Sequence, residues 1–203
     1  MNRTSRPEPL TVDRVDSPIG AILVVHDGQG QLRALDFEDH APRMRQLLRL
    51  YHGAEGIGHT LRDGPAPHAT RHALERYFAG DLTAVDGLGI MTGGTEFQRA
   101  VWTALRRIRP GTTTTYGALA RQVGRPRAMR AVGAANGANP ISIVLPCHRV
   151  IGADASLTGY GGGLDRKRWL LTHEGAMAGA GSVADRAGQA AARAAAPVMR
   201  DNA

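Results

Sequence analysis

Short apolar runs separated by turn signals dominate the first part of the chain. An apolar run at residues 21–25 is separated by Asp27-Gly28 from a second extended run at 32–37. Two such runs on either side of an Asp-Gly pair are typical of a β-hairpin. Residues 43–51 then predict a short helix, and residues 53–67, rich in Gly, His and Pro, predict a loop.

The next segment has the spacing of an amphipathic helix that stops at Gly80. A glycine commonly ends a helix because it adopts the left-handed conformation without steric cost. Residues 81–94 are rich in glycine and predict the connection between two halves of the chain. The apolar positions on one face of the predicted helix are Ala69, Ala73, Leu74 and Tyr77.

A second half begins at Thr95, which is followed three residues later by Gln98. This spacing predicts a capping box, in which each side chain bonds the backbone N–H of the other residue. The helix that follows ends at Pro110-Gly111 and carries one apolar stripe, made of Phe97, Val101, Leu105 and Ile108.

Two short helices are predicted after this one. They cover residues 116–123 and 127–136, and Gly124-Arg125-Pro126 forms the turn between them. Two short helices joined by a glycine-containing turn outline a helix-turn-helix. We expect the inner face of the second helix to consist of Ala128, Ala131, Val132 and Ala135.

The outward face of the second helix carries charge but little bulk. It presents Arg127, Arg130 and Ala134, with Gly133 and Gly137 nearby. A helix that reads the major groove normally presents longer polar side chains. A small, cationic surface suits close approach to phosphates or to a minor groove. From the helix alone, a solvated helix without a ligand is an equally good interpretation.

The only cysteine of the chain follows an apolar run. Residues 141–145 are rich in β-branched side chains and predict a buried strand, which ends at Pro146. Cys147 and His148 come directly after it. A thiol is nucleophilic as thiolate, and a neighbouring imidazole favours that form. The alternative is a structural thiol, because free cysteine is among the most buried residue types.

The last predicted helix covers residues 166–174, with Asp165 as its cap and Gly175 as its stop. Glu174 lies at the C-terminal end, where the helix dipole disfavours an anion. Its carboxylate could pair with a surface arginine or orient an imidazole. Residues 177–203 are rich in Ala, Gly and Arg, and we expect a disordered or loosely helical tail.

Composition narrows the class of protein. The single cysteine among 203 residues excludes a disulfide framework and a multi-cysteine zinc site, so we expect no metal and no cofactor. No stretch is apolar enough for a signal peptide or a membrane span, which predicts a cytoplasmic protein without a membrane partner. The formal net charge of +7 favours a polyanionic partner.

Ordered motifs across residues 95–175 resemble the methylated-DNA:protein-cysteine methyltransferases, also called alkylguanine-DNA alkyltransferases. In the first half, Ser17-Pro18-Ile19-Gly20 and Tyr77-Phe78-Ala79-Gly80 resemble the family's N-terminal domain. The motifs of the second half are Thr95 to Trp102, Tyr116, Arg130-Ala131-Val132-Gly133, Asn136-Gly137-Ala138-Asn139-Pro140, Pro146-Cys147-His148-Arg149-Val150, the run 157–164, the run 166–171, and His173-Glu174-Gly175.

The resemblance implies an α/β (α+β) protein with two domains. Residues 1–92 would form a ribonuclease H-like domain. Residues 93–176 would form a mostly helical DNA-binding and alkyltransferase domain that contains the helix-turn-helix, 116–137, and the active-site cysteine.

The resemblance also implies a function, DNA repair by direct reversal of damage. The protein would take an alkyl group from O6 of guanine, and less readily from O4 of thymine, onto its own cysteine. Because a thioether has no easy leaving group, each molecule would act once. The partner would be double-stranded DNA containing alkylated guanine, with the base flipped out. We expect a monomer, which could bind cooperatively along DNA.

The resemblance assigns roles in the reaction to four residues. Cys147 matches the alkyl acceptor. His148 matches the residue that draws the thiol proton through a water, and Glu174 matches the carboxylate that orients this histidine. Tyr116 matches the residue that crowds the neighbouring phosphate and serves the leaving base, to which its hydroxyl can give a proton.

Further residues match positions of the family's DNA and base sites. Arg130 matches a finger that enters the duplex, and Asn139 matches a hinge between the recognition helix and the active-site turn. Val150 and Tyr160 match residues that line the base pocket. The remaining expected DNA contacts are Arg127, Ala131 and Ala134.

Three departures from the family pattern stand out: Ile108-Arg109-Pro110-Gly111 inverts a usual order, Thr115 stands where Ser is commoner, and Ala155 replaces a usual Gly. Ala155 puts the preference for alkyl size in doubt. Two other classes compete with repair. One is a helix-turn-helix regulator with a redox-sensing cysteine, and the other is a cysteine hydrolase using Cys147, His148 and Glu174.

Overall fold

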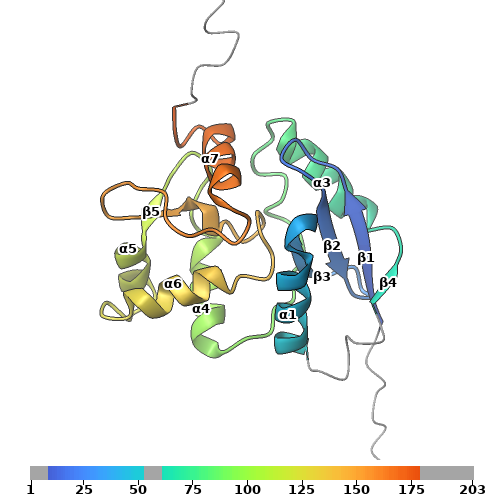
Figure 1. Ribbon diagram of the computed structural model, residues 1–203, viewed down its shortest axis with the longest axis horizontal. Coiled ribbons are helices and arrows are strands. Elements are labelled where there is room, and N and C mark those ends of the chain that lie inside the picture. The colour runs from blue at the N-terminus through green and yellow to red at the C-terminus, as the bar shows by residue number, and fades with distance from the viewer. Residues whose placement is uncertain (1–8, 53–60, 179–203) are drawn as a thin grey trace, which may run out of the picture.

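The computed structural model describes residues 9–52 and 61–178, which form two halves that lie side by side (Figure 1). The N-terminal half, up to residue 92, holds a sheet and two helices, and the C-terminal half is mostly helical. The N-terminal elements are β1 (Leu10–Val15), β2 (Ile22–His26), β3 (Leu32–Phe37), η1 (Glu38–His40), α1 (Ala41–His52), β4 (Leu61–Asp63) and α3 (His68–Phe78). The C-terminal elements are α4 (Glu96–Leu105), β5 (Thr114–Thr115), α5 (Tyr116–Gln122), α6 (Met129–Gly137), η2 (Cys147–Arg149), β6 (Val150–Ile151) and α7 (Leu164–His173).

The sheet has four strands in the order β3-β2-β1-β4. β2 and β3 form the predicted hairpin, with a register shift at Val25/His26, and β1 pairs antiparallel with β2. β4 pairs parallel with β1, so part of the segment 53–67, predicted as a loop, is a strand. Residues 53–60 lie outside the described part of the chain.

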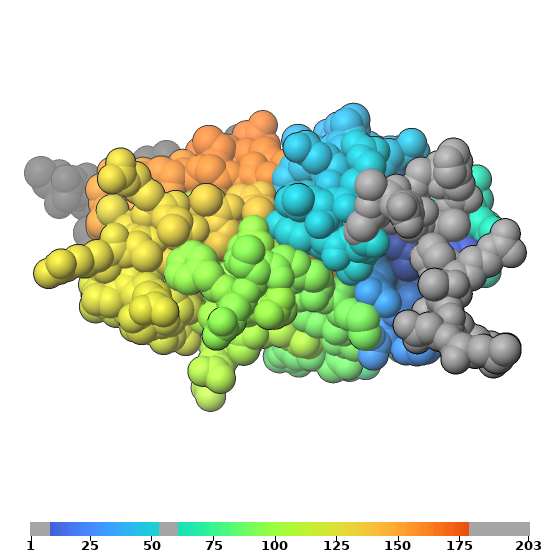
Figure 2. Space-filling view, turned by 90° about the horizontal axis from the view of Figure 1, so that it is seen from below, coloured from blue at the N-terminus to red at the C-terminus, as the bar shows by residue number. Residues whose placement is uncertain are grey.

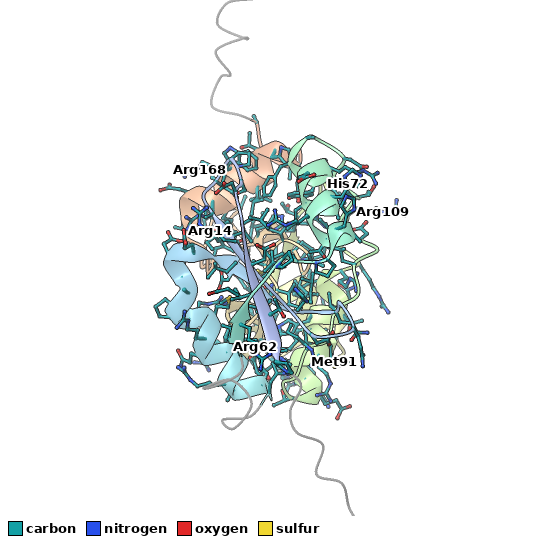
Figure 3. The ribbon with its side chains drawn as sticks, turned by 90° about the vertical axis from the view of Figure 1, so that its right-hand side faces the viewer. Arg14, Arg62, His72, Met91, Arg109 and Arg168 are labelled. Atoms are coloured by element: carbon teal, nitrogen blue, oxygen red, sulfur yellow. The ribbon has the colours of Figure 1, made fainter. Side chains whose placement is uncertain are left out.

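The two helices of this half cover opposite faces of the sheet. Figure 3, with Arg14 labelled on β1 and Arg62 on β4, shows α1 on one side of β1 and α3 on the other. Met44 and Leu48 of α1 pack against one face. Tyr77 and Leu74 of α3 belong to a second, larger core on the opposite face. The predicted helices at 43–51 and around Tyr77 are therefore confirmed.

The free edge of β3 is paired with segments from outside the sheet. The Leu35 N–H donates to the Pro140 carbonyl at 3.0 Å, and the Ser142 N–H donates to the Leu35 carbonyl at 2.8 Å. Leu32 makes a similar pair of bonds with Gly89 and Met91. An unpaired edge strand exposes backbone donors and acceptors. Here that edge fixes the segment that leads to Cys147.

The strand predicted at 141–145 is wrong. Ile141 forms an isolated bridge to Leu35, and the chain then turns back, with the Leu145 N–H bonded to the Ile141 carbonyl at 3.0 Å. Ile143 has φ of +70°, a left-handed conformation that is strained for a β-branched residue. The apolar character of this run reflects burial in the core, where it forms a turn instead of a ladder.

The helix-turn-helix is present, with corrected boundaries. α6 begins at Met129, because the Ala128 N–H bonds the Arg125 carbonyl and extends the turn, so Arg127 lies before the helix. Ala131 is exposed, and the inner face of α6 is instead Val132, Ala135 and Asn136.

The other helix ends follow partly as expected. The Thr95–Gln98 capping box is confirmed, with both reciprocal bonds formed. α7 begins at Leu164 with Gly163, at φ of +90°, as its cap, so Asp165 lies in the first turn and does not cap the helix. A glycine takes this conformation without penalty, which explains why no side-chain cap is used.

The larger core runs continuously from the sheet into the C-terminal helices. Trp102, 2% exposed, lies in it, and its indole N–H donates to the Ala135 carbonyl at 2.9 Å, which joins α4 to α6. Figure 2 shows the surfaces of the two halves meeting along α1. No helix within residues 9–52 and 61–178 is long and apolar enough to cross a bilayer. The expected tail, apart from its first two residues, lies outside the described part of the chain.

Candidate active site

Cys147 opens a 3-10 turn that is anchored on both sides. Before it, the segment 140–142 is bonded to the edge of β3. After it, β6 pairs parallel with β5, with Thr114 opposite Val150. Both anchors are backbone hydrogen bonds, so the position of Cys147 depends on the fold more than on neighbouring side chains.

Asn139 organises the turn and contacts the thiol. Its Nδ2 lies 3.0 Å from Sγ of Cys147 and donates to the Leu145 carbonyl at 2.8 Å, while its Oδ1 accepts from the Ile141 N–H at 2.9 Å. The Asn139 side chain is completely buried. One amide therefore joins the end of α6 to the turn that carries Cys147.

The thiol is buried and is protonated at rest. Cys147 is 4% exposed, and burial raises its pKa, although the Asn139 donor and the charges of Arg43 and Lys167 act in the opposite sense. Arg43 reaches this region from α1 and donates to the Gly137 carbonyl at 2.6 Å and to the Asn139 carbonyl at 3.1 Å. A buried thiol needs a base before it can act as a nucleophile.

His148 and Glu174 form a completely buried pair, with 2.9 Å between Nε2 and Oε1. Burial lowers the pKa of His148 and outweighs the opposing effect of Glu174. The imidazole is therefore neutral at neutral pH, with its proton on the nitrogen that faces the carboxylate. Nδ1 is buried and has no hydrogen-bond partner among the described residues. The lone pair of Nδ1 is therefore able to accept a proton.

Glu174 remains charged because it receives several donors. Nε and Nη2 of Arg149 bond its two oxygens, each at 2.8 Å, and the Tyr77 hydroxyl donates to Oε1 at 2.7 Å. Burial alone would raise the pKa of Glu174, but the bonds from Arg149 and His148 outweigh burial and hold the pKa far below its usual range. The carboxylate at the unfavourable helix end is thus paired with a buried arginine and also orients an imidazole.

Lys167, the only lysine of the chain, is completely buried in α7. Its Nζ donates to the carbonyls of Val150 and Thr158, each at 2.6 Å. Burial lowers its pKa to about 8. Lys167 therefore ties the strand after the active-site turn to the loop 152–159, and places a positive charge near the thiol.

A cavity of about 760 Å³ lies between the helix-turn-helix and the loop 152–159. Tyr116 and Arg130 line it on one side, and Thr158 and Gly159 line it on the other. The Tyr116 hydroxyl is 3.4 Å from the Thr158 carbonyl. Cys147 does not line this cavity and lies in the buried turn that precedes the loop.

Tyr160 joins the buried pair, with its ring 6.3 Å from the ring of His148 at an interplanar angle of 80°. Its hydroxyl is buried without a hydrogen-bond partner among the described residues, and burial raises its pKa. Val150 is buried and is held through its carbonyl. Unsatisfied buried polar groups such as this hydroxyl are common where a ligand supplies the missing partner.

The expected DNA-contact residues divide into two groups. Arg130 and Tyr116 line the cavity. Arg127, Ala131 and Ala134 are exposed on the helix-turn-helix but do not line it. The structure therefore brings Arg130 close to the cavity, and leaves the other three on the surface of the same motif.

Four residues of the site were not predicted to act in it: Arg149, Lys167, Tyr77 and Arg43. Arg149 lies in the same short run as Cys147. A charged residue in a run expected to be buried indicates a buried partner of opposite charge, and this was the signal that could have identified it. Tyr77 was predicted only as part of a helix core, and its hydroxyl gave no separate signal. Nothing in the local sequence around Arg43 indicates a contact with residues almost 100 positions away.

Fold and site together define a class of protein, in which a buried cysteine with a histidine–glutamate pair lies beside a helix-turn-helix. Two family profiles match the chain. The 6-O-methylguanine DNA methyltransferase ribonuclease-like domain matches residues 13–90, and the DNA binding domain of the same family matches residues 96–176.

Relatives and solved structures agree with these profiles. A methylated-DNA–protein-cysteine methyltransferase of Salmonella typhimurium is 52% identical over 166 residues, which is 82% of this chain and 96% of that protein. A protein of the same name from Shigella flexneri is 49% identical over the same shares of both chains. The crystal structure of Mycobacterium tuberculosis OGT in complex with DNA has a TM-score of 0.69 and 40% identity, covering 81% of this chain and 92% of that chain.

The chain therefore belongs to the 6-O-methylguanine DNA methyltransferase family. The resemblance noted in its motifs is confirmed, as are the mixed α/β fold class and the membership of an enzyme family.

We expect Asn139→Ala to destabilise the protein by roughly 2–4 kcal/mol, because a buried carbonyl and a buried N–H lose their partner. It should also raise the pKa of Cys147 further, because the Asn139 donor lowers it. Chemical denaturation and a thiol titration measure the two effects. Asn136→Ala is the matched control, since its amide makes only a 3.4 Å contact with the Cys147 carbonyl. Equal effects of both substitutions would contradict the role of Asn139.

We expect the free energy of unfolding to fall as the pH drops through the usual pKa range of glutamate. The pKa of Glu174 is lower in the folded than in the unfolded protein, so its stabilisation is complete above about pH 5 and is lost progressively below it. Glu174→Gln should flatten this dependence and cost about 3 kcal/mol at neutral pH, because Arg149 loses its buried counter-ion. Denaturation at a series of pH values measures both, and an unchanged slope would contradict the assignment.

Proposed function

We propose that this protein repairs DNA by accepting an alkyl group, such as methyl, from O6 of guanine onto Sγ of Cys147, and less readily from O4 of thymine. The observation that carries the proposal is a buried thiol beside a neutral imidazole, itself oriented by a carboxylate, in a chain of the 6-O-methylguanine DNA methyltransferase family. The relatives' names and the DNA complex of a related structure support alkyl transfer on DNA.

In the proposed step, the S–C bond forms as the O6–C bond breaks. The thiol proton passes to Nδ1 of His148, through a water, while Glu174 stabilises the imidazolium that forms. The departing guanine gains negative charge and takes up a proton, which the hydroxyl of Tyr116, a residue that lines the cavity, would donate. The products are guanine and a thioether. The imidazolium then releases its proton to solvent and the Tyr116 oxygen regains one, so overall the thiol proton replaces the alkyl group on guanine. Because the thioether has no good leaving group, each molecule reacts once.

The helix-turn-helix would bring the base to the thiol. Reaching O6 inside a duplex requires the nucleotide to be flipped out, which costs a few kcal/mol. Arg130 at the edge of the cavity would fill the space left in the stack, and the small exposed side chains of Ala131 and Ala134 would permit close contact with the strand. Arg127 and Tyr116 would contact phosphates.

The competing functions have less support. A redox-sensing cysteine is normally exposed and has a low pKa, whereas Cys147 is buried and its pKa is raised. A hydrolase needs Cys and His to converge on one carbonyl, which residues adjacent in the chain, such as Cys147 and His148, rarely do. Multiple turnover on an ester or amide would revive the hydrolase.

We expect one methyl group to be added per molecule when the protein is mixed with duplex DNA that contains one O6-methylguanine. Intact-mass analysis followed by peptide mapping should place the methyl group on Cys147, and Cys147→Ser should remain unmodified. Unmethylated duplex of the same sequence is the control. No adduct, or more than one turnover per molecule, would contradict the proposal.

We expect Arg130→Ala to slow repair in duplex DNA by about 10-fold or more, because one base-stack contact is worth on the order of 1–3 kcal/mol. Reaction with the free alkylated base should change little, since it requires no flipping. Arg127→Ala, at an exposed position away from the cavity, is the matched control and should have the smaller effect in duplex DNA. Equal slowing of both reactions by Arg130→Ala would rule out the finger role.

A further inference from the structure

Tyr77 joins the N-terminal half directly to the buried His148–Glu174 pair. It belongs to α3 and is completely buried, and its hydroxyl donates to Oε1 of Glu174 at 2.7 Å. The two residues are 97 positions apart in the chain. In Figure 1, α3 and α7 lie at the same end of the molecule, on either side of the boundary between the halves.

The orientation of Tyr77 is fixed from α7. Nε2 of His173 lies 2.8 Å from the Tyr77 carbonyl, and the ring centroids of these two residues are 5.4 Å apart. Trp169 stacks on His173, with centroids 4.8 Å apart and an interplanar angle of 19°. His173 directly precedes Glu174, so the same helix end that carries the carboxylate also holds the residue that donates to it.

The Tyr77 hydroxyl shares an oxygen with the imidazole. Oε1 of Glu174 accepts from Tyr77 at 2.7 Å and from Nε2 of His148 at 2.9 Å. Burial and the Glu174 charge raise the pKa of Tyr77, so its hydroxyl keeps its proton and remains a donor. Each donor to a carboxylate oxygen reduces the negative charge available to the others.

We propose that Tyr77 is a positioning residue that acts on His148 through Glu174: its hydroxyl, supplied by the N-terminal half, donates to Oε1 of Glu174 and limits the negative charge that this oxygen offers to His148. The consequence for alkyl transfer rests on the proposed function, whereas the effect on His148 does not. In this arrangement the imidazole remains neutral down to a lower pH than it would beside a carboxylate that lacks this donor. It can therefore still take the thiol proton at that lower pH.

Other charged groups surround the pair and must stay constant in a test. Those that bear on Glu174 and His148 are Arg149 of η2, Lys167 of α7, Tyr77 of α3 and Tyr160, whose ring packs against His148. Those that bear on Cys147 are Arg43 of α1, Asp36 of β3 and Lys167. Arg149 bonds both carboxylate oxygens, so we expect the carboxylate of a Tyr77→Phe variant to keep its place while the negative charge on Oε1 increases.

The test is Tyr77→Phe in the full chain, with the pKa of His148 measured by NMR titration of histidine-labelled protein and assigned with His148→Gln. We expect the pKa to rise by about 0.5–1 unit, since one hydrogen bond to the carboxylate is lost. In the pH profile of the reaction with free O6-methylguanine, the acid limb should shift to higher pH by the same amount. The rate at a pH on that limb should therefore fall about 3–10-fold. Tyr77→Met removes the same hydroxyl and makes the same prediction if Tyr77→Phe does not fold.

Tyr51→Phe is the matched control. Tyr51 also lies in the N-terminal half and donates across the boundary, to the Ala138 carbonyl at 3.1 Å, but it does not touch Glu174. It should leave the pKa of His148 unchanged. An unchanged or lowered pKa in the Tyr77 variants, or an equal rise in Tyr51→Phe, would overturn the proposal. If His148 shifts as expected but Cys147 is never alkylated, the proposed function fails and the role of Tyr77 toward Glu174 stands.

Discussion

The buried carboxylate of Glu174 is the interaction on which this structure depends. A charge removed from water is costly unless donors replace its hydration. Here Arg149, His148 and Tyr77 supply them, from the active-site turn and from α3. The three partners come from two segments, residues 148–149 and α3, which are distant in the chain from each other and from Glu174. Satisfying this one charge therefore fixes the mutual position of α7, the turn that carries Cys147 and the N-terminal half. The electrostatics that stabilise the fold are the same that orient the proposed base.

A second constraint is the edge of β3. This edge bonds residues 140–142, which lead to Cys147, and so attaches that segment to the sheet. The segment is not a strand, because only Ile141 forms a bridge to Leu35. The left-handed Ile143 costs energy and persists only because the surrounding structure determines it. The surrounding contacts are the backbone bonds to Leu35 before Ile143 and the bond from the Asn139 amide to the Leu145 carbonyl after it. The turn that results places the thiol in the core.

Local pattern was enough to predict the β2–β3 hairpin, most of the helices and the helix-turn-helix, because spacing, caps and glycine stops are local properties. It failed at 141–145, where burial and β-branching are shared by strands and by core turns. β1 and β4 were missed because their pairing is not local and their residues are mixed in polarity. Among site residues, Cys147, His148 and Glu174 were candidates from residue type and position alone, and the resemblance implied their roles. Tyr77 was not identified as a site residue. A tyrosine on the apolar face of a helix has the same sequence pattern whether its hydroxyl is a buried donor or not.

The single lysine of the chain contributes to the electrostatic environment of the thiol. In a chain whose other long cationic side chains are arginines, Lys167 occupies a buried position with two carbonyl partners. A compact ammonium has three N–H groups to satisfy there, whereas a planar guanidinium would have five. Its charge and that of Arg43 favour the thiolate, and burial opposes them and prevails. A thiol kept protonated in this way resists oxidation and stray electrophiles. For an acceptor proposed to react once, that protection matters as much as reactivity, since any other reaction would consume the molecule.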